Sequence, residues 1–171
     1  MLSEKMEKAL NAQVNAELYS SYLYLSMEAY LQNSGLEGFA NWMRIQAQEE
    51  LLHAMKIYDF IFSCGGRSRL AAIDAPTQEW DSVLAVFENA LEHERYVTSR
   101  VNELVNLAIE EKDHATNVFL QWFVTEQVEE EETAGGIVSR LRRTVGISGG
   151  SGCETARRRK DGVRIHQYRG N

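Results

Sequence analysis

The stretch Gln46-Ala47-Gln48-Glu49-Glu50-Leu51-Leu52-His53 puts a carboxylate and an imidazole three residues apart within a long helical pattern. On a helix, positions i and i+3 lie on one face, so Glu50 and His53 can bind one ion together. Apolar side chains occupy the same face before and after this pair, as Phe39 and Ile57 do. Burying a carboxylate costs several kcal/mol unless a partner compensates for the lost water. Either the pair is an error in the apolar stripe, or a cation lies there.

The composition of the chain is that of a single helical domain. Its 171 residues suffice for a sizeable core, and hydrophobic residues make up 44% of them. A single proline, Pro76, permits long uninterrupted helices. The chain contains no run of eighteen apolar residues and does not begin with the apolar core of a signal peptide, so we expect no membrane span and a cytoplasmic location. Cys64 and Cys153 form no CxxC pair, which excludes a cysteine metal site of that kind.

Charge divides the chain into two unequal parts. Residues 1–139 carry 9 Lys and Arg against 23 Asp and Glu, whereas residues 140–171 carry 9 against 2. The acidic body favours cations as partners and disfavours nucleic acid. The excess of Lys and Arg is confined to residues 140–171, which we treat separately from the acidic body.

Apolar residues recur at three- and four-residue steps through four segments, which predicts an all-α four-helix bundle. The expected helices are residues 3–33, 36–64, 81–111 and 114–143. Residues 66–82 show no helical period, and extended they span roughly 55 Å at about 3.3 Å per residue. A helix of about 28 residues is only roughly 42 Å long. The connection can therefore cross the whole bundle and leave the second and third helices parallel.

Each predicted helix has a polar exception to its apolar stripe near mid-length. Stacking helices of similar length brings these exceptions to one level, where several carboxylates would repel each other unless cations lay between them. Two di- or trivalent ions resolve the conflict, and carboxylate with imidazole ligands favours iron or manganese. Inward carboxylates together with Glu-x-x-His are characteristic of di-iron four-helix bundles. The residues of this predicted layer are Glu17, Glu50, His53, Glu94, Gln127 and Glu130.

Other candidates are weaker. Glu111-x-x-His114 has the same spacing but falls at the break between the third and fourth helices. Tyr24 lies two turns after Glu17 on the same stripe, so it is either core packing or a hydrogen-bonding and redox neighbour of the metals, and we favour the second. We assign Trp122 to the core.

Four stretches resemble bacterial and archaeal non-haem ferritins: residues 15–24, 35–43, 48–54 and 119–131. The resemblance runs from Met1 to about Arg143. It implies a ferritin-like antiparallel four-helix bundle over residues 1–143, with a long crossover between helices two and three.

The resemblance also implies roles for individual residues. Glu17, Glu50 and His53 would bind a first iron, and Glu50 would bridge to a second iron bound by Glu94 and Glu130. Gln127 would hydrogen-bond oxygen species at the irons, and Tyr24 matches the tyrosine beside the centre. A third iron site would comprise Glu49, Glu126, Glu129 and Glu130.

The implied activity is a ferroxidase: Fe(II) is oxidised by dioxygen or hydrogen peroxide, and the ferric product is stored as a mineral in a cage of twenty-four identical subunits. Haem is not expected, because Leu52 stands where the haem-binding relatives have methionine. A rubrerythrin would add an iron domain with a CxxC motif, which this sequence lacks. A bacterioferritin would have a second Glu-x-x-His in the fourth helix, where this sequence has Gln127-x-x-Glu130. A structural four-helix interaction protein remains as the alternative without enzymatic activity.

Residues 144–171 depart from the resemblance, which would continue with a leucine-rich fifth helix. Six of the twelve glycines lie here, along with Arg157-Arg158-Arg159-Lys160, and no apolar stripe is visible. Such a composition favours a loosely attached tail. A change of reading frame or deliberate engineering explains it, or it is a basic arm for an anionic partner such as nucleic acid.

Overall fold

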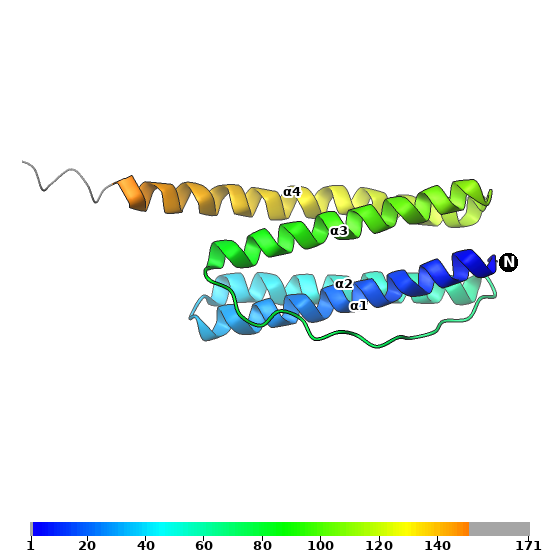
Figure 1. Ribbon diagram of the computed structural model, residues 1–171, viewed down its shortest axis with the longest axis horizontal. Coiled ribbons are helices and arrows are strands. Elements are labelled where there is room, and N and C mark those ends of the chain that lie inside the picture. Colours follow the sequence, from blue (N-terminus) through cyan, green and yellow to red (C-terminus); the bar gives the residue numbers. More distant parts are fainter. Residues whose placement is uncertain (1, 151–171) are drawn as a thin grey trace, which may run out of the picture.

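The computed structural model describes residues 2–150, with side chains described for residues 2–144 (Figure 1). Four helices account for most of this part, and it contains no strand. Their bounds are α1 Glu4–Asn33, α2 Glu37–Ser63, α3 Val83–Glu110 and α4 His114–Gly150. The predicted all-α class and the first three helices are confirmed. No helix among the described residues is long and apolar enough to cross a membrane.

Local chemistry explains where the helices begin and end. The Ser3 hydroxyl accepts a hydrogen bond from the Met6 backbone N–H at 3.0 Å and so caps α1. The turn after α1 passes through Gly35 at φ +72°, and the turn after α2 passes through Gly65 at φ +73°. Only glycine adopts this left-handed conformation without steric cost.

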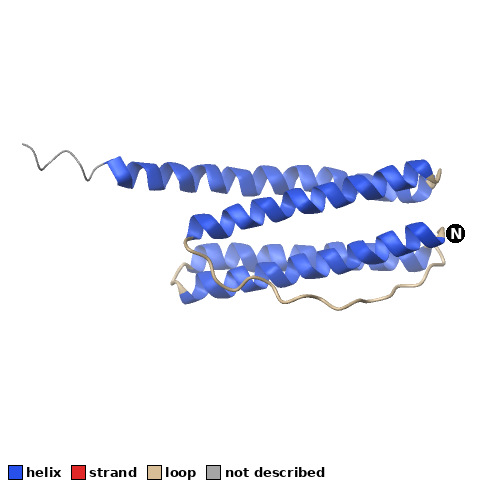
Figure 2. Cartoon of the chain, in the orientation of Figure 1, coloured by secondary structure: helices blue, strands red, loops and turns tan. Residues whose placement is uncertain are grey.

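The connection between α2 and α3 runs back along the bundle, as its length predicted. It leaves α2 at one end and enters α3 at the other, so the two helices point the same way (Figures 1 and 2). Hydrogen bonds fix it to α1: Ser26 donates to the Thr77 carbonyl at 2.6 Å, and Tyr30 donates to the Trp80 carbonyl at 2.7 Å. α1 and α2 form one antiparallel pair, and α3 and α4 form the other.

α4 is longer than the sequence predicted. We expected it to end at Arg143, but it is continuous through Gly135 and Gly136 and ends at Gly150, past the ends of the other helices (Figure 1). The backbone hydrogen bonds of a helix do not require an apolar stripe, whose loss we took as the end of the helix. Residues 151–171, including Cys153 and the four-residue basic run, lie outside the described part.

The core consists of two apolar clusters along the length of the bundle. One gathers around Leu10, Ile57 and Phe123, and the other around Met27 and Phe87. Buried polar residues from all four helices fall between these clusters in sequence: Glu17, Glu50, Glu94 and Gln127. The polar layer that the stripes predicted therefore exists, at mid-bundle.

Candidate metal centre

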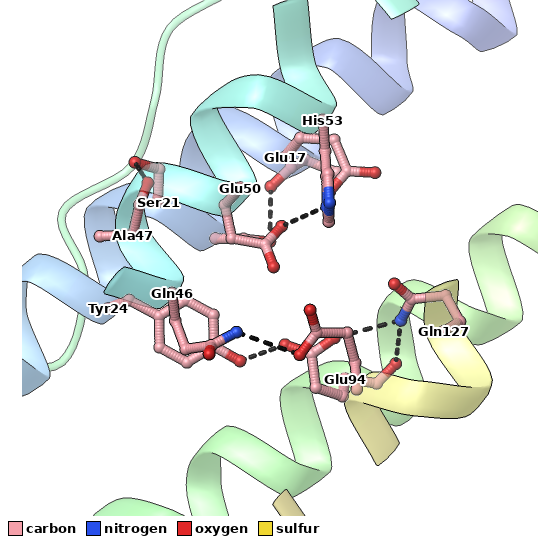
Figure 3. Close-up of polar contacts among 12 residues, drawn as sticks. Glu17, Ser21, Tyr24, Gln46, Ala47, Glu50, His53, Glu94 and Gln127 are labelled. Atoms are coloured by element: carbon pink, nitrogen blue, oxygen red, sulfur yellow. Dashed lines mark hydrogen bonds and ion pairs between the residues drawn. The ribbon is translucent and has the colours of Figure 1, made fainter. Parts of the chain in front are cut away.

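Three carboxylates of the polar layer are shielded from water almost completely. Glu17, Glu50 and Glu94 are each 1% exposed, which is exceptional for carboxylates without a cationic partner. Figure 3 shows two groups facing each other across the bundle: Glu17, Glu50 and His53 on the α1–α2 side, and Glu94 and Gln127 on the α3–α4 side.

The α1–α2 group has the form of a metal site. Glu17, Glu50 and His53 each present a ligand atom, and these atoms lie within 4.8 Å of one another. His53 Nδ1 lies 3.5 Å from Glu50 Oε2. Glu17 Oε2 and Glu50 Oε1 are buried, and no donor group of another residue reaches them. The two carboxyls contact each other (Figure 3), so only a proton held by one of them could form a hydrogen bond between them. A buried acceptor without a donor costs about 1–3 kcal/mol, more for a charged group, and a cation at this point would satisfy both oxygens.

The α3–α4 group centres on Glu94. The Tyr24 hydroxyl donates to Glu94 Oε1, and Gln127 Nε2 donates to Glu94 Oε2 at 3.1 Å (Figure 3). A parallel contact comes from α2, where Gln46 Nε2 donates to Glu130 Oε2 at 3.0 Å. Tyr24 and Gln46 therefore connect the two helix pairs at the level of the layer and hold the carboxylates of Glu94 and Glu130 toward its interior.

Burial and mutual repulsion raise the pKa values of these acids. The pKa of Glu17 is well above its usual range, first because of burial and then because of the charge of Glu50. Burial followed by the charge of Glu94 does the same for Glu50. The pKa of Glu94 is also raised by burial, and that of Glu130 rises to about 7 through burial and the charge of Glu94. A bound cation would reverse these shifts, because it favours the ionised carboxylates.

We predict that the metal-free protein becomes less stable as the pH rises from about 4.5 to 7. Folded Glu130 has a pKa of about 7 against 4.5 for the free side chain, so the folded state binds more protons in this window and loses its advantage as they leave. After allowance for solvent screening, we expect Glu130 to contribute about 2 kcal/mol. Chemical unfolding with a chelator at pH 5 and pH 7.5 measures this. A Glu130→Gln variant should show a flatter pH dependence, and an unchanged slope would contradict the assignment.

The other predicted site residues occupy less enclosed positions. Glu49 and Glu126 are half-buried and act on Glu130 through their charge, and Glu129 is exposed. Among the described side chains, only Glu17, Glu50 and His53 bring three ligand atoms together; the third-site residues do not belong to this group, and neither do Glu94 and Glu130. The competing Glu111-x-x-His114 does not belong to the group either. Glu111 lies just after the end of α3 and accepts a hydrogen bond from the Ser3 hydroxyl.

Trp122 was wrongly assigned to the core. It is 37% exposed because its neighbour Phe123 takes the inward position on α4. Its ring lies edge-on to the His53 ring at 5.3 Å, and Lys56 Nζ lies 3.6 Å from its centroid. It therefore covers the outer side of the His53 imidazole.

Sequence reasoning missed Gln13 as part of the layer. It is 1% exposed, and its Nε2 donates to Glu17 Oε1 at 2.8 Å. Its position four residues before Glu17, on the same helix face, was the available signal.

Comparison with known proteins places this geometry in a family. The model of the ferritin-like domain matches residues 7–144. A bacterial non-heme ferritin of Bacteroides fragilis is 49% identical over 143 residues, which is 84% of this chain and 90% of the relative. A probable bacterial non-heme ferritin-like protein of Haemophilus influenzae is 43% identical over 141 residues, 82% of this chain and 86% of that protein.

Solved ferritin structures are similar to this chain over most of its length. The open pore ferritin of the archaeon Archaeoglobus fulgidus superposes with a TM-score of 0.83 at 59% identity, covering 83% of this chain and 88% of that one. The Chlorobium tepidum ferritin gives 0.81 at 39% identity, covering 83% and 87%. A four-helix bundle with a buried Glu-Glu-His group, matched over more than four-fifths of its length by these proteins, belongs to the ferritin family.

Proposed function

We propose that the polar layer is a ferroxidase centre, which oxidises Fe(II) with dioxygen or hydrogen peroxide and passes Fe(III) to a store. Iron storage is the function of the ferritin family to which the chain belongs. The observation that carries the ferroxidase proposal is the pair of buried, unpartnered oxygens on Glu17 and Glu50, beside the His53 imidazole. Two carboxylates and one imidazole form a ligand set suited to iron.

In this proposal the two sides of the layer bind one iron each. Glu17, Glu50 and His53 bind the first, and Glu94 with Glu130 binds the second, with Glu50 as the bridge. Tyr24 and Gln127 hold the Glu94 carboxylate by hydrogen bonds, which restricts its rotation. Ligating carboxylates are commonly oriented by such partners. Glu49, Glu126 and Glu129 would bind a third iron near the half-buried Glu130.

The residues also account for the direction of the reaction. Carboxylate oxygens are hard ligands and bind Fe(III) more strongly than Fe(II), so the site favours oxidation. The raised pKa values of the four acids mean that iron binding releases protons, which links occupancy to pH. Iron is the substrate here, and a site with a single histidine allows the product to leave.

We further propose assembly into a homo-oligomeric cage of twenty-four subunits, in the cytoplasm. Several large apolar side chains are exposed on the single chain: Tyr22 at 49%, Leu25 at 44% and Phe62 at 51%. Such side chains suit burial against other subunits. Size-exclusion chromatography with light scattering tests this assembly.

Stopped-flow mixing with Fe(II) in air tests the activity. We expect Fe(II) to disappear much faster than in buffer, with a rate that saturates at about two irons per subunit in the first turnover if both sites fill. A rate equal to that of buffer would leave a purely structural bundle as the better description. Anaerobic Fe(II) titration gives the number of sites independently of oxidation.

Deleting residues 151–171 should leave the initial rate within about twofold of the intact chain. All predicted ligands lie between Glu17 and Glu130, which the deletion does not touch, and changes remote from such features usually cost little. The same stopped-flow assay measures the effect. A loss of more than tenfold would show that the basic tail takes part in iron entry or in the assembly that the activity needs.

A further inference from the structure

One side chain connects the metal centre to the opposite helix without being a ligand. Gln13 lies in α1 one helical turn before Glu17, and its side chain is only 1% exposed. Its Nε2 donates to Glu17 Oε1 at 2.8 Å, and its Oε1 accepts from Arg100 Nε of α3 at 2.9 Å. Both polar groups of the Gln13 amide therefore have a hydrogen-bond partner: the nitrogen has the Glu17 carboxylate, and the oxygen has the Arg100 guanidinium.

Arg100 is fixed by further contacts at the α1–α3 boundary. Its Nη2 donates to the Ala12 carbonyl at 3.0 Å, and its Nη1 donates to the Tyr96 hydroxyl at 3.2 Å. The guanidinium is planar, and its donors are held in a rigid fork. Three hydrogen bonds from this fork to three different residues fix the place at which Gln13 meets it.

The chemistry of arginine decides the orientation of the amide. A guanidinium only donates hydrogen bonds, so Gln13 must present its oxygen to Arg100. Its nitrogen then faces Glu17 and can only donate, which suits an ionised carboxylate. Glu17 Oε1 is thereby occupied, while Glu17 Oε2 stays without a partner in the layer.

We infer that Gln13 and Arg100 are positioning residues, which hold Glu17 so that one of its oxygens is fixed and the other is presented to the first iron. The inference rests on the proposed function, because it takes Glu17 as an iron ligand. Neither residue touches the irons in this role. Outer partners of metal ligands typically change metal affinity or activity about 10–100-fold when removed.

The test is a double-mutant cycle on anaerobic Fe(II) binding. Gln13→Leu keeps the approximate size of the side chain and removes both hydrogen bonds, whereas Arg100→Met removes the cation from a half-buried position. We expect Gln13→Leu to raise the Fe(II) dissociation constant of the first site about 10–100-fold. Arg100→Met should have a smaller effect in the wild-type background and none beyond Gln13→Leu in the double variant, because Arg100 acts through the amide.

Two readouts separate positioning from general stability. Under aerobic conditions, Gln13→Leu should raise the Fe(II) concentration needed for half-maximal rate more than it lowers the maximal rate. Its Co²⁺ complex should have an altered visible spectrum, because the geometry at Glu17 changes. Gln32→Leu, an exposed glutamine in the same helix, is the matched control and should leave both readouts unchanged. Thermal melting of the metal-free variants confirms that they are folded, and Arg100→Met supplies the test if Gln13→Leu does not fold.

Outcomes for the inference and for the proposed function differ. If the wild-type protein neither binds nor oxidises Fe(II), the proposed function fails. If the wild-type protein is active and Gln13→Leu binds Fe(II) within twofold of it, the inference fails alone. The inference also fails if Arg100→Met changes the Fe(II) dissociation constant equally in the wild-type and the Gln13→Leu backgrounds. Arg100 would then act on the site without Gln13.

Discussion

Glu50→Gln should lower the initial rate of Fe(II) oxidation by about 100-fold or more. Loss of a partner that merely orients a ligand costs about 10–100-fold, and Glu50 is the proposed bridge between both irons. The amide keeps the shape of the side chain but removes its charge and one acceptor oxygen. Glu50 is 1% exposed and no donor reaches one of its oxygens, so the main loss expected at that oxygen is the contact with the metal. Stopped-flow absorbance under air, at matched iron per subunit, measures the rate.

The stability of the same variant should not fall together with its rate. Burial and the charge of Glu94 raise the pKa of Glu50 because its ionised form is destabilised in the metal-free protein. A neutral amide removes that repulsion, so metal-free Glu50→Gln should melt at the same temperature as the wild type or higher. Glu132→Gln, exposed on α4, is the control for the loss of one acid. If the Glu50→Gln variant keeps more than a tenth of the wild-type rate, Glu50 is not the bridging iron ligand that we propose.

The helices and the polar layer were predictable because both depend on period. Within each helix, buried apolar residues recur at helical spacing, and this spacing fixes which positions face inward. Leu10 in α1, Ile57 in α2 and Phe87 in α3 are examples. A carboxylate in such a stripe, such as Glu17 or Glu94, therefore stands out in the sequence. The length of residues 66–82 allowed the crossover, because an extended connection of that length can span the bundle.

Features that depend on contacts between helices were not predictable in the same way. The bond from Arg100 to Gln13 joins residues 87 positions apart, and no local pattern indicates it. The spacing of Phe123 and Gln127 indicates that Phe123 faces inward, but the contact of Trp122 with the His53 ring depends on how α4 packs against α2. The end of α4 was missed because a regular backbone continued beyond the apolar stripe.

Adding a redox-inert divalent ion at pH 7 should raise the melting temperature of the metal-free protein substantially. An ion that binds only the folded state at 100 times its dissociation constant stabilises it by about 2.7 kcal/mol. For a chain of this size that corresponds to roughly 5–10 °C. Zn²⁺ or Co²⁺ serves as the probe, because neither is oxidised by air at this site. Differential scanning calorimetry with chelator and with excess ion gives the two midpoints.

The pH dependence of this stabilisation identifies the ligands. Protons and the ion compete for the same carboxylates, whose pKa values are raised by burial, so the stabilisation should fall as the pH drops from 7 toward 4.5. The metal-free protein changes in the other direction over this range, because its protonated acids stabilise the fold at low pH. The two stability curves should therefore converge as the pH falls. Glu50→Gln should abolish most of the metal-induced shift, whereas Glu132→Gln should retain it. An equal shift in both variants would place the ion on the acidic surface and not in the polar layer.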